Sequence, residues 1–327
     1  MNPTLASVPI LILYPHRGCN CRCVMCDIWK DRTKDEISAD DLQRHMQDIR
    51  LLNVRWVVLS GGEPLMHSDL FRLAALVRDA GVRVTILTTG LLLEDFAEKI
   101  VGNVDDVVVS LDGPPSVHDH IRRVPGAFQR VAAGIAALHR LDPNFSVSAR
   151  STVQRLNHQS VRETARAAYG LGCRSISFLG ADMSSEAFNR LAPLTVLGQS
   201  KLALDSDQIS ELARQFSGLL TDWAGTGFIV ESESKLERIL EHFRAHLGLA
   251  EPTAPSCNAP WVSAVVESDG TVRPCFFQPS IGKVEKDATL LDVLNGSEAV
   301  RFRSNLDVST NPICKRCVCS LNFKECA

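Results

Sequence analysis

The feature that most constrains the fold is a regular alternation of β-rich and helical runs along the first 180 residues. Several β-rich runs are continuously apolar, as expected of parallel strands that are covered on both faces. Amphipathic patterns between them predict helices. The predicted strands are residues 8–14, 56–59, 83–88, 106–111, 145–152 and 175–179, and the predicted helices are residues 39–51, 69–80, 93–100, 128–139 and 159–169.

Six successive βα units imply right-handed crossovers and either a parallel barrel or an open, doubly wound sheet. Ser38 with Asp41, and Gly81, are signals for the start and the end of predicted helices. In both folds, ligands bind at the carboxyl ends of the strands. Polar and glycine-rich clusters occur at these predicted ends, at residues 18–26, 60–64, 88–90, 110–113 and 180–182.

Four thiols lie within eight residues after the first predicted strand, in the run Cys19-Asn20-Cys21-Arg22-Cys23-Val24-Met25-Cys26. Thiols this crowded on one loop suit a soft metal better than disulfides. Cys19, Cys23 and Cys26 have the spacing C-x3-C-x2-C. Three thiolates around a cubane iron–sulfur cluster leave one iron open to a ligand that is not protein. The run therefore predicts a cluster that takes part in chemistry.

A second motif, Ser60-Gly61-Gly62-Glu63-Pro64, follows the second predicted strand. In this order the two motifs resemble those of the radical S-adenosylmethionine (radical SAM) superfamily. The resemblance implies an α/β fold, a partial (β/α)6 TIM-like barrel, in which Cys19, Cys23 and Cys26 hold a [4Fe–4S] cluster. It implies that S-adenosylmethionine binds the open iron and yields a 5′-deoxyadenosyl radical that abstracts a hydrogen atom from the substrate. It also implies an electron donor such as flavodoxin or ferredoxin.

The resemblance further assigns S-adenosylmethionine contacts at the strand ends. The two glycines let the backbone approach a ligand, and their carbonyls can accept hydrogen bonds from its ammonium group. Glu63 either adds a negative charge for that ammonium or locks the turn, and a plain capping Glu is the alternative. Without the resemblance, the polar residues at the later strand ends simply lead into turns. The expected contacts are Gly61, Gly62, Glu63, Pro64, Ser110, Asp112 and Ser151.

Cysteines around a predicted hairpin mark the C-terminal part. Asp269-Gly270 predicts the hairpin turn between strands at 261–267 and 271–277, and a helical stretch follows around residues 290–304. The pattern is similar to the SPASM and twitch extensions of radical SAM enzymes, which implies one auxiliary [4Fe–4S] cluster. Four cysteines with a C-x2-C pair suit a structural zinc ion equally well. The four are Cys257 before the first strand, Cys275 on the second strand, Cys314 and Cys317.

Four other cysteines lie outside these two sets. Cys21 departs from the family pattern, and we interpret it as a small apolar residue rather than a ligand. Cys173 precedes a strand and is interpreted as buried. Cys319 and Cys326 do not fit the longer pattern that holds two auxiliary clusters, which favours the shorter type with one. No catalytic residue is assigned, and Cys319 and Cys326 are candidate hydrogen-atom donors.

The composition is that of an ordinary globular chain, with 45% hydrophobic residues and a net charge of −3. No basic tract suggests a nucleic-acid partner, and no apolar run reaches the about 18 residues that cross a bilayer. Since no export signal is evident, the cysteines imply a reducing cytoplasm. A composition shift at residues 250–256 predicts a barrel domain of residues 1–249, with a loop or lid at 181–206 and further helices at 207–223 and 234–247, and a cluster domain of residues 250–327.

The residues that bind the substrate cannot be chosen from the sequence. The length of the segment before the first cysteine ligand, however, narrows the class of substrate. Only 18 residues precede Cys19, too few for the leader-binding domain of peptide-modifying members. The leading expectation is dehydrogenation or epimerisation of a small molecule such as a sugar or aminocyclitol. The alternatives are a maturase of a ribosomal peptide, an iron–sulfur electron carrier and a zinc-stabilised binding module.

Overall fold

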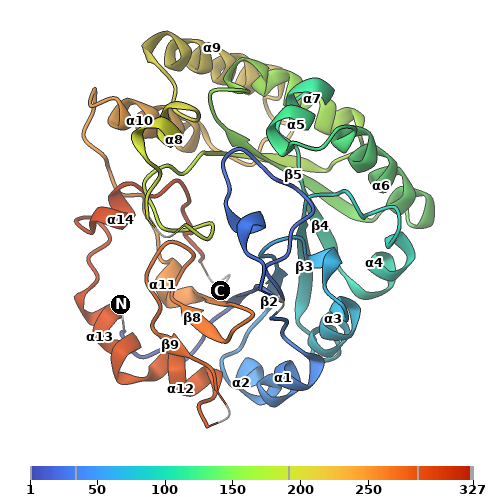
Figure 1. The fold of residues 1–327 in the computed structure, drawn as a ribbon, viewed down its shortest axis with the longest axis vertical. Coiled ribbons are helices and arrows are strands. Elements are labelled where there is room, and N and C mark those ends of the chain that lie inside the picture. Colours follow the sequence, from blue (N-terminus) through green and yellow to red (C-terminus); the bar gives the residue numbers. More distant parts are fainter. Residues whose placement is uncertain (1, 34, 191, 286, 325–327) are drawn as a thin grey trace.

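A single curved sheet organises the computed structural model, which describes residues 2–33, 35–190, 192–285 and 287–324 (Figure 1). Its nine strands have the order β6-β5-β4-β3-β2-β1-β7-β8-β9. The first six run parallel and in chain order, and the antiparallel pairs are confined to the last three. This architecture confirms the predicted partial barrel with a small hairpin module.

All six predicted barrel strands are present, each within two residues of its predicted ends. Their continuous apolar runs become the centre of the sheet because both faces are covered. The strands are β1 (Ile10–Leu13), β2 (Trp56–Leu59), β3 (Arg83–Thr88), β4 (Asp106–Ser110), β5 (Ser146–Val153), β6 (Ser175–Gly180), β7 (Ser263–Val266), β8 (Thr271–Arg273) and β9 (Gly282–Lys283).

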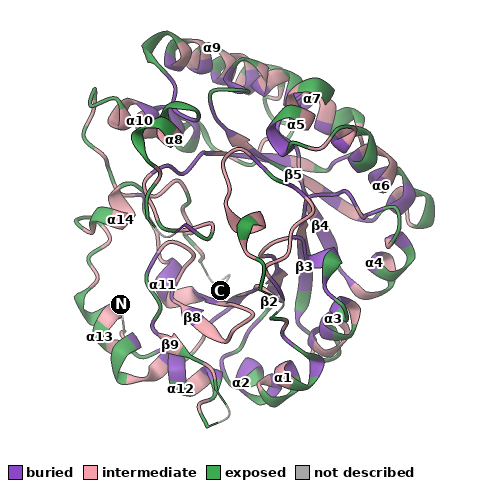
Figure 2. Ribbon diagram, viewed as in Figure 1, coloured by how far each residue is buried: buried purple, intermediate pink, exposed green. Residues whose placement is uncertain are grey.

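The helices of the barrel lie outside the curved sheet, and their outer faces are exposed while the strands are buried (Figures 1 and 2). The longer ones bury one apolar face each, as an amphipathic pattern predicts. The α-helices are α1 (Ala39–Arg44), α2 (Met46–Leu51), α3 (Leu70–Asp79), α4 (Ala97–Asn103), α5 (Pro115–Arg122), α6 (Ala127–Leu141), α7 (Val161–Gly170), α8 (Val196–Ser200), α9 (Ser206–Asp222), α10 (Glu233–His246), α11 (Ala259–Val262), α12 (Leu290–Asn295), α13 (Ser297–Asn305) and α14 (Pro312–Lys315). Three short 3₁₀ helices are η1 (Ile28–Lys30), η2 (Pro64–Met66) and η3 (His158–Ser160).

The predicted start and stop signals act as expected. Ser38 and Asp41 form a capping box at the start of α1, in which each side chain bonds the other's backbone amide. Gly81 follows the end of α3 with φ +76°, a conformation that costs glycine little. The predicted helix 39–51 is divided in two at His45, which caps the end of α1.

Four α-helices of the described residues were not predicted, the short helices α11 and α14 of the C-terminal module and the helices α5 and α8 of the barrel. Helix α5 begins with a proline pair, Pro114-Pro115, and its remaining residues are mostly polar, so no long apolar pattern reveals it. Helix α8 lies inside the predicted loop or lid at 181–206, where Thr195 caps its first turn. The rest of that segment carries no regular element among the residues described, in agreement with the prediction of a loop.

The C-terminal module continues the barrel sheet rather than standing apart from it. Strand β7 pairs in parallel with β1, in register from Ile10 opposite Ser263 to Leu13 opposite Val266. The sheet therefore crosses the predicted division at residue 250, which stays a prediction about sequence units. The hairpin between β7 and β8 is confirmed, with Gly270 at φ +86° in its turn.

Two details of the predicted module are wrong. The strand predicted from residue 261 starts at Ser263, because residues 259–262 form helix α11 after a proline. Cys275 was placed on the returning strand, but β8 ends at Arg273 and Cys275 lies in the turn that follows. The helical stretch around 290–304 is present as α12 and α13, which are separated at Gly296.

The N-terminal residues bind the far end of the module. The backbone of Leu5 both donates to and accepts from the side-chain amide of Asn295, at 2.7 and 3.0 Å. Arg303 donates from Nε to the carbonyl of Pro3 at 2.5 Å. Helices α12 and α13 are thus tied to the start of the barrel. In the described part of the chain no helix is both long and apolar enough to cross a membrane.

Candidate functional site

The cysteine loop leaves the carboxyl end of β1 and crosses the open centre of the barrel (Figure 1). Helix α5 holds one side of it, because the amides of Arg22 and Val24 donate to the carbonyls of Arg122 and Ile121 at 3.2 and 3.1 Å. On the other side Arg190 donates to the carbonyl of Met25 at 2.7 Å. Long-range contacts therefore fix a loop that has little regular structure of its own.

The three predicted ligands of this loop come together. Cys19 and Cys26 both interact electrostatically with Cys23. Burial raises the pKa of both thiols to about 12. The pKa of Cys23 is instead lowered, because Cys21 donates a hydrogen bond to its sulfur and Arg122 lies alongside with Nη1 3.5 Å from Sγ. Three cysteine side chains on one loop are the ligands that a [4Fe–4S] cluster with one open iron takes, so this donor set fits such a cluster.

Cys21 lies apart from these three in its surroundings. Its side chain is 1% exposed and packs with Leu91 and Ala127. The pKa of its thiol is raised, chiefly because it is the donor to Cys23. This environment supports the prediction that Cys21 fills space and orients Cys23 rather than binding iron.

The Ser60–Pro64 motif is a tight turn against the cysteine loop. Gly61 has φ +104°, and a Cβ at Gly62 would lie 1.9 Å from the carbonyl oxygen of Gly18, so only glycine fits at both positions. The amide of Glu63 donates to that same carbonyl at 2.8 Å. Pro64 begins the buried helix η2. The turn thus brings backbone close to the three thiols, where a ligand on the open iron would lie.

The side chain of Glu63 favours the turn-locking interpretation. Its carboxylate is fully buried and accepts from the Thr88 hydroxyl, the Thr89 hydroxyl and the amides of Leu65 and Thr89, at 2.6–3.0 Å. Burial raises the pKa of this carboxyl. With four donors already present, Glu63 joins the ends of β2 and β3 rather than offering a free charge.

The predicted contacts on β4 and β5 differ in what they face. Burial alternates along β5, so Arg150 and Thr152 share the accessible face towards the barrel interior, whereas Ser151 is 1% exposed and points to the helices. Ser110 is partly accessible at the end of β4. Asp112 is fully buried and forms a 2.6 Å ion pair with Arg122 while accepting from the Thr152 amide at 2.8 Å. Asp112 therefore acts on the cysteine loop through Arg122.

The four C-terminal thiols also converge. Cys275 interacts electrostatically with Cys257 and Cys314, and burial raises the pKa of its thiol to about 12. Cys317 interacts electrostatically with Cys275 and Cys257, and burial raises the pKa of its thiol as well. Asn311 caps α14 by accepting from the amides of Ile313 and Cys314.

The donor set of four thiols suits either metal that the sequence leaves open. Among the residues described, no three or more His, Cys, Asp or Glu side chains form a group that could hold one metal ion, in either thiol set. Four cysteine thiolates are ligands that a structural zinc ion and a [4Fe–4S] cluster both accept.

A cavity of about 580 Å³ extends from the Ser60–Pro64 turn to the C-terminal thiol set. It reaches Gly61 and Gly62 on one side and Cys317 on the other. Its aromatic wall comes from three separate segments, with ring centroids 4.8–6.3 Å apart, and consists of Tyr14, Phe188, Phe276 and Phe277. A volume of this size suits a small molecule.

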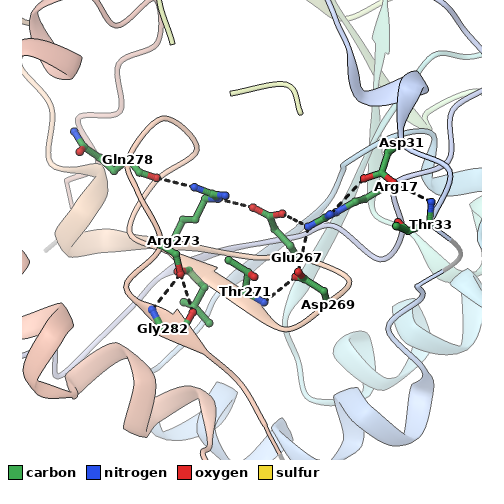
Figure 3. A network of polar contacts seen from close by, with 11 residues as sticks. Arg17, Asp31, Thr33, Glu267, Asp269, Thr271, Arg273, Gln278 and Gly282 are labelled. Atoms are coloured by element: carbon green, nitrogen blue, oxygen red, sulfur yellow. Dashed lines mark hydrogen bonds and ion pairs between the residues drawn. The ribbon is translucent and has the colours of Figure 1, made fainter. Parts of the chain in front are cut away.

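A charged network borders the same cavity (Figure 3). Arg17 pairs with Glu267 at 2.6 Å and with Asp31 at 3.3 Å, which ties the cysteine loop to the hairpin. Glu267 also pairs with Arg273, whose Nη1 donates to the carbonyl of Gln278 at 3.2 Å. The wall therefore offers both donors and acceptors to a polar ligand.

Cys319 faces a second, smaller pocket of about 120 Å³ with Arg150 and residues of β6 and α10. The residue is exposed. Its role as a hydrogen-atom donor stays a prediction. Cys326 lies outside the described residues. Cys173 is 5% exposed within the main core, as predicted.

Sequence reasoning missed two arginines that hold the cysteine loop. Arg122 lies on the unpredicted helix α5. Arg190 follows β6 in the predicted lid and pairs with Asp182 at 2.6 Å before reaching the loop. Neither carries a local pattern. The only signal was their position, since both follow strands whose ends were already assigned to the site.

Comparisons with known families agree with this geometry. Residues 13–182 match the model of the radical SAM superfamily. Residues 257–318 match the SPASM iron–sulfur cluster-binding domain. The first range covers the barrel from the end of β1 to the end of β6, and the second contains all four C-terminal thiols.

Curated relatives match about half of the chain. An AdoMet-dependent heme synthase of Methanosarcina barkeri is 34% identical over 160 residues, which are 47% of this chain and 45% of that protein. A probable GTP 3′,8-cyclase of Methanothermobacter marburgensis is 34% identical over 133 residues, 38% of this chain and 43% of that protein. The chain thus spans less than half the length of these relatives.

Solved structures extend the similarity over the whole fold. SuiB of Streptococcus suis, bound to the precursor peptide SuiA, has a TM-score of 0.70 at 14% identity and covers 97% of this chain and 72% of its own. Native anSMEcpe with bound AdoMet has a TM-score of 0.65 at 18% identity, with 90% and 82% covered. At these identities the likeness concerns the fold.

Proposed function

The chain belongs to the radical SAM superfamily and carries a SPASM iron–sulfur domain, and from this premise we propose that it oxidises a small, hydroxyl-bearing molecule. Its cofactors are a [4Fe–4S] cluster with S-adenosylmethionine and an auxiliary iron–sulfur cluster. When bound, they supply a 5′-deoxyadenosyl radical that removes a hydrogen atom and an acceptor for the electron that the substrate radical releases. The reaction class that follows is dehydrogenation, with epimerisation as the close alternative.

Each part of the chain has a defined task in this proposal. Cys19, Cys23 and Cys26 hold the first cluster, and Gly61 and Gly62 bring backbone carbonyls to the ammonium group of S-adenosylmethionine. Ser110 contacts the cofactor from the end of β4. The auxiliary cluster is held by four other cysteines, Cys257, Cys275, Cys314 and Cys317.

The observation that carries the proposal is the 580 Å³ cavity, which is lined by Gly61 and Gly62 of the turn beside the cysteine loop and by Cys317 of the auxiliary set. One substrate in it could lose a hydrogen atom at one wall and an electron at the other. The network of Arg17, Glu267 and Arg273 suits hydroxyl groups, and Phe188 and Phe276 suit the carbon face of a ring. A carbinol carbon that loses a hydrogen atom, then an electron and the hydroxyl proton, becomes a ketone.

Epimerisation would use the same first step and a different second one. The carbon radical would then take a hydrogen atom back from a thiol on the opposite face. The thiyl radical left behind would be returned to the thiol by one electron from the reduced auxiliary cluster and one proton from water. Cys319, which lines the neighbouring 120 Å³ pocket, is the cysteine that we propose for this role. Product analysis with a candidate polyol separates the two, because a ketone indicates dehydrogenation and an inverted alcohol indicates epimerisation.

The test is anaerobic reconstitution followed by reduction with S-adenosylmethionine. We expect about eight irons per chain, four for each cluster, and release of 5′-deoxyadenosine. Cys23→Ala should reduce that release at least 100-fold, whereas Cys21→Ala, its buried neighbour, should retain it. Equal activity of wild type and Cys23→Ala would overturn the assignment. A lack of cleavage in the fully loaded wild type would favour an electron carrier, and tight binding of short peptides would favour a peptide maturase.

A further inference from the structure

We infer that Arg238, with Gln278, raises the reduction potential of the auxiliary cluster and so makes that cluster an electron acceptor. This inference rests on the proposed function, since it needs a cluster on the four C-terminal thiols. Arg238 is a positioning residue here, because it acts on the cluster through its charge and through the backbone of a ligand. It lies on α10, outside the module that holds the thiols.

The contacts of Arg238 leave its charge without a carboxylate partner. Its two terminal nitrogens donate to carbonyl oxygens, Nη2 to Cys317 at 2.6 Å and Nη1 to Thr253 at 3.1 Å. Among the residues described, the groups that act electrostatically on it are Cys317, Cys319 and Cys257. The guanidinium thus fixes the backbone of one ligand, Cys317. It interacts electrostatically with two of the four ligands, Cys317 and Cys257.

A partly buried cation without an anion is unfavourable, because its solvation is lost and nothing replaces it. Four thiolates around a [4Fe–4S] cluster carry net negative charge, which supplies the missing partner. One-electron reduction adds a further negative charge to the cluster. A fixed positive charge stabilises that reduced form more than the oxidised form, so it raises the potential.

Gln278 adds a hydrogen bond in the same direction. Its side chain is 2% exposed, and its Nε2 donates to the sulfur of Cys314 at 3.3 Å and to Oδ1 of Asn311 at 3.3 Å. Arg273 holds its backbone carbonyl. An N–H bond to a ligand sulfur stabilises the more negative, reduced state of a cluster.

The first thiol set differs in how its cations are paired. Arg122, whose Nη1 lies 3.5 Å from the Cys23 sulfur, is neutralised by Asp112 at 2.6 Å, and both are buried. Arg190, which donates to the carbonyl of Met25, is neutralised by Asp182 at 2.6 Å. Among the residues described, Arg238 at the auxiliary set has no carboxylate partner, so we expect the auxiliary cluster to have the higher potential and a released electron to move towards it.

The experiment is a potentiometric titration of the reconstituted protein, followed by electron paramagnetic resonance of the auxiliary cluster. Arg238→Met should lower the reduced-to-oxidised ratio at a fixed potential about tenfold, equivalent to about 59 mV for a one-electron couple. Arg238→Lys keeps the charge and should retain most of the wild-type ratio. Gln278→Leu should lower the ratio by a smaller factor, and it tests the same inference if Arg238→Met fails to assemble the cluster.

Lys235→Met is the matched control. Lys235 lies one turn earlier on α10 and is exposed, and in the described part of the chain no hydrogen bond or ion pair joins it to a cluster thiol, so its removal should leave the auxiliary potential unchanged. Unshifted potentials in both Arg238→Met and Gln278→Leu, with about eight irons bound, would overturn the inference. An iron count near four in the wild type would instead overturn the proposed function, so the two failures are distinguishable.

Discussion

At the residue scale, the buried pair of Asp112 and Arg122 links the end of β4 to the cysteine loop. From the sequence, Asp112 is predicted to contact the cofactor because it follows a strand end, and that contact stays a prediction. In the structure its carboxylate pairs with Arg122 on α5, which also lies 3.5 Å from the Cys23 sulfur. The local pattern shows that a polar residue stands at a strand end, but it cannot show which long-range partner satisfies it.

Removing one member of this pair should be costly. Arg122→Met leaves Asp112 as an uncompensated buried charge and should lower the free energy of unfolding by about 3–5 kcal/mol. Adding Asp112→Asn removes that charge and should restore part of the loss. Urea denaturation of the iron-free protein measures both variants. A double variant less stable than Arg122→Met alone would show that the pair is not the source of the effect.

At the element scale, the strands were predictable and the short helices were not. Strands β2 and β3 begin and end where the apolar runs do, because both faces of a parallel strand are buried. Helix α5 begins with prolines and buries a histidine and an arginine, so its role depends on partners and not on hydrophobic periodicity. Cys275 was misplaced because β8 has only three residues, too few for a pattern to define its end.

Helix α5 should make the fold sensitive to acid. His118 is fully buried and its Nδ1 accepts the Asp112 amide at 3.1 Å, and burial lowers its pKa to about 3. In the unfolded chain His118 therefore binds a proton as the pH falls through about 6.5, whereas in the folded chain it stays neutral. The free energy of unfolding therefore falls as the pH drops below that value. The loss from this group should reach about 2 kcal/mol at pH 5.

The measurement is the unfolding free energy from urea titrations at pH 7 and pH 5. His118→Gln keeps an acceptor for the amide but does not titrate, so it should lose less stability over this interval than the wild type. His120→Gln changes an exposed histidine on the same helix and serves as the control. An identical pH dependence in His118→Gln and wild type would contradict the assignment.

At the scale of the whole molecule, the two sequence units behave as one body. The thiol sets and the order of the barrel strands were predictable, because each rests on a motif or a local pattern. The continuous sheet pairs Ile10 of β1 with Ser263 of β7, and the hydrogen bonds between Leu5 and Asn295 join residues 290 positions apart. No local pattern encodes contacts over such separations.

This continuity predicts a single unfolding transition. Asn295→Ala removes two hydrogen bonds to the Leu5 backbone and should destabilise the protein by about 1–3 kcal/mol. Near- and far-ultraviolet circular dichroism should still follow one coincident curve at a lower midpoint. Asn305→Ala, an exposed position on α13, should leave the midpoint in place. Two separated transitions in Asn295→Ala would show that the module unfolds alone.

The pairing of β1 with β7 has a consequence for the redesign of the cavity. Cys19 follows the end of β1, Cys257 precedes the start of β7, and four parallel residue pairs join these two strands. Backbone hydrogen bonds hold these pairs, so replacing side chains of the cavity wall removes none of them. We therefore expect the two strands to keep their register when the cavity is changed for another substrate.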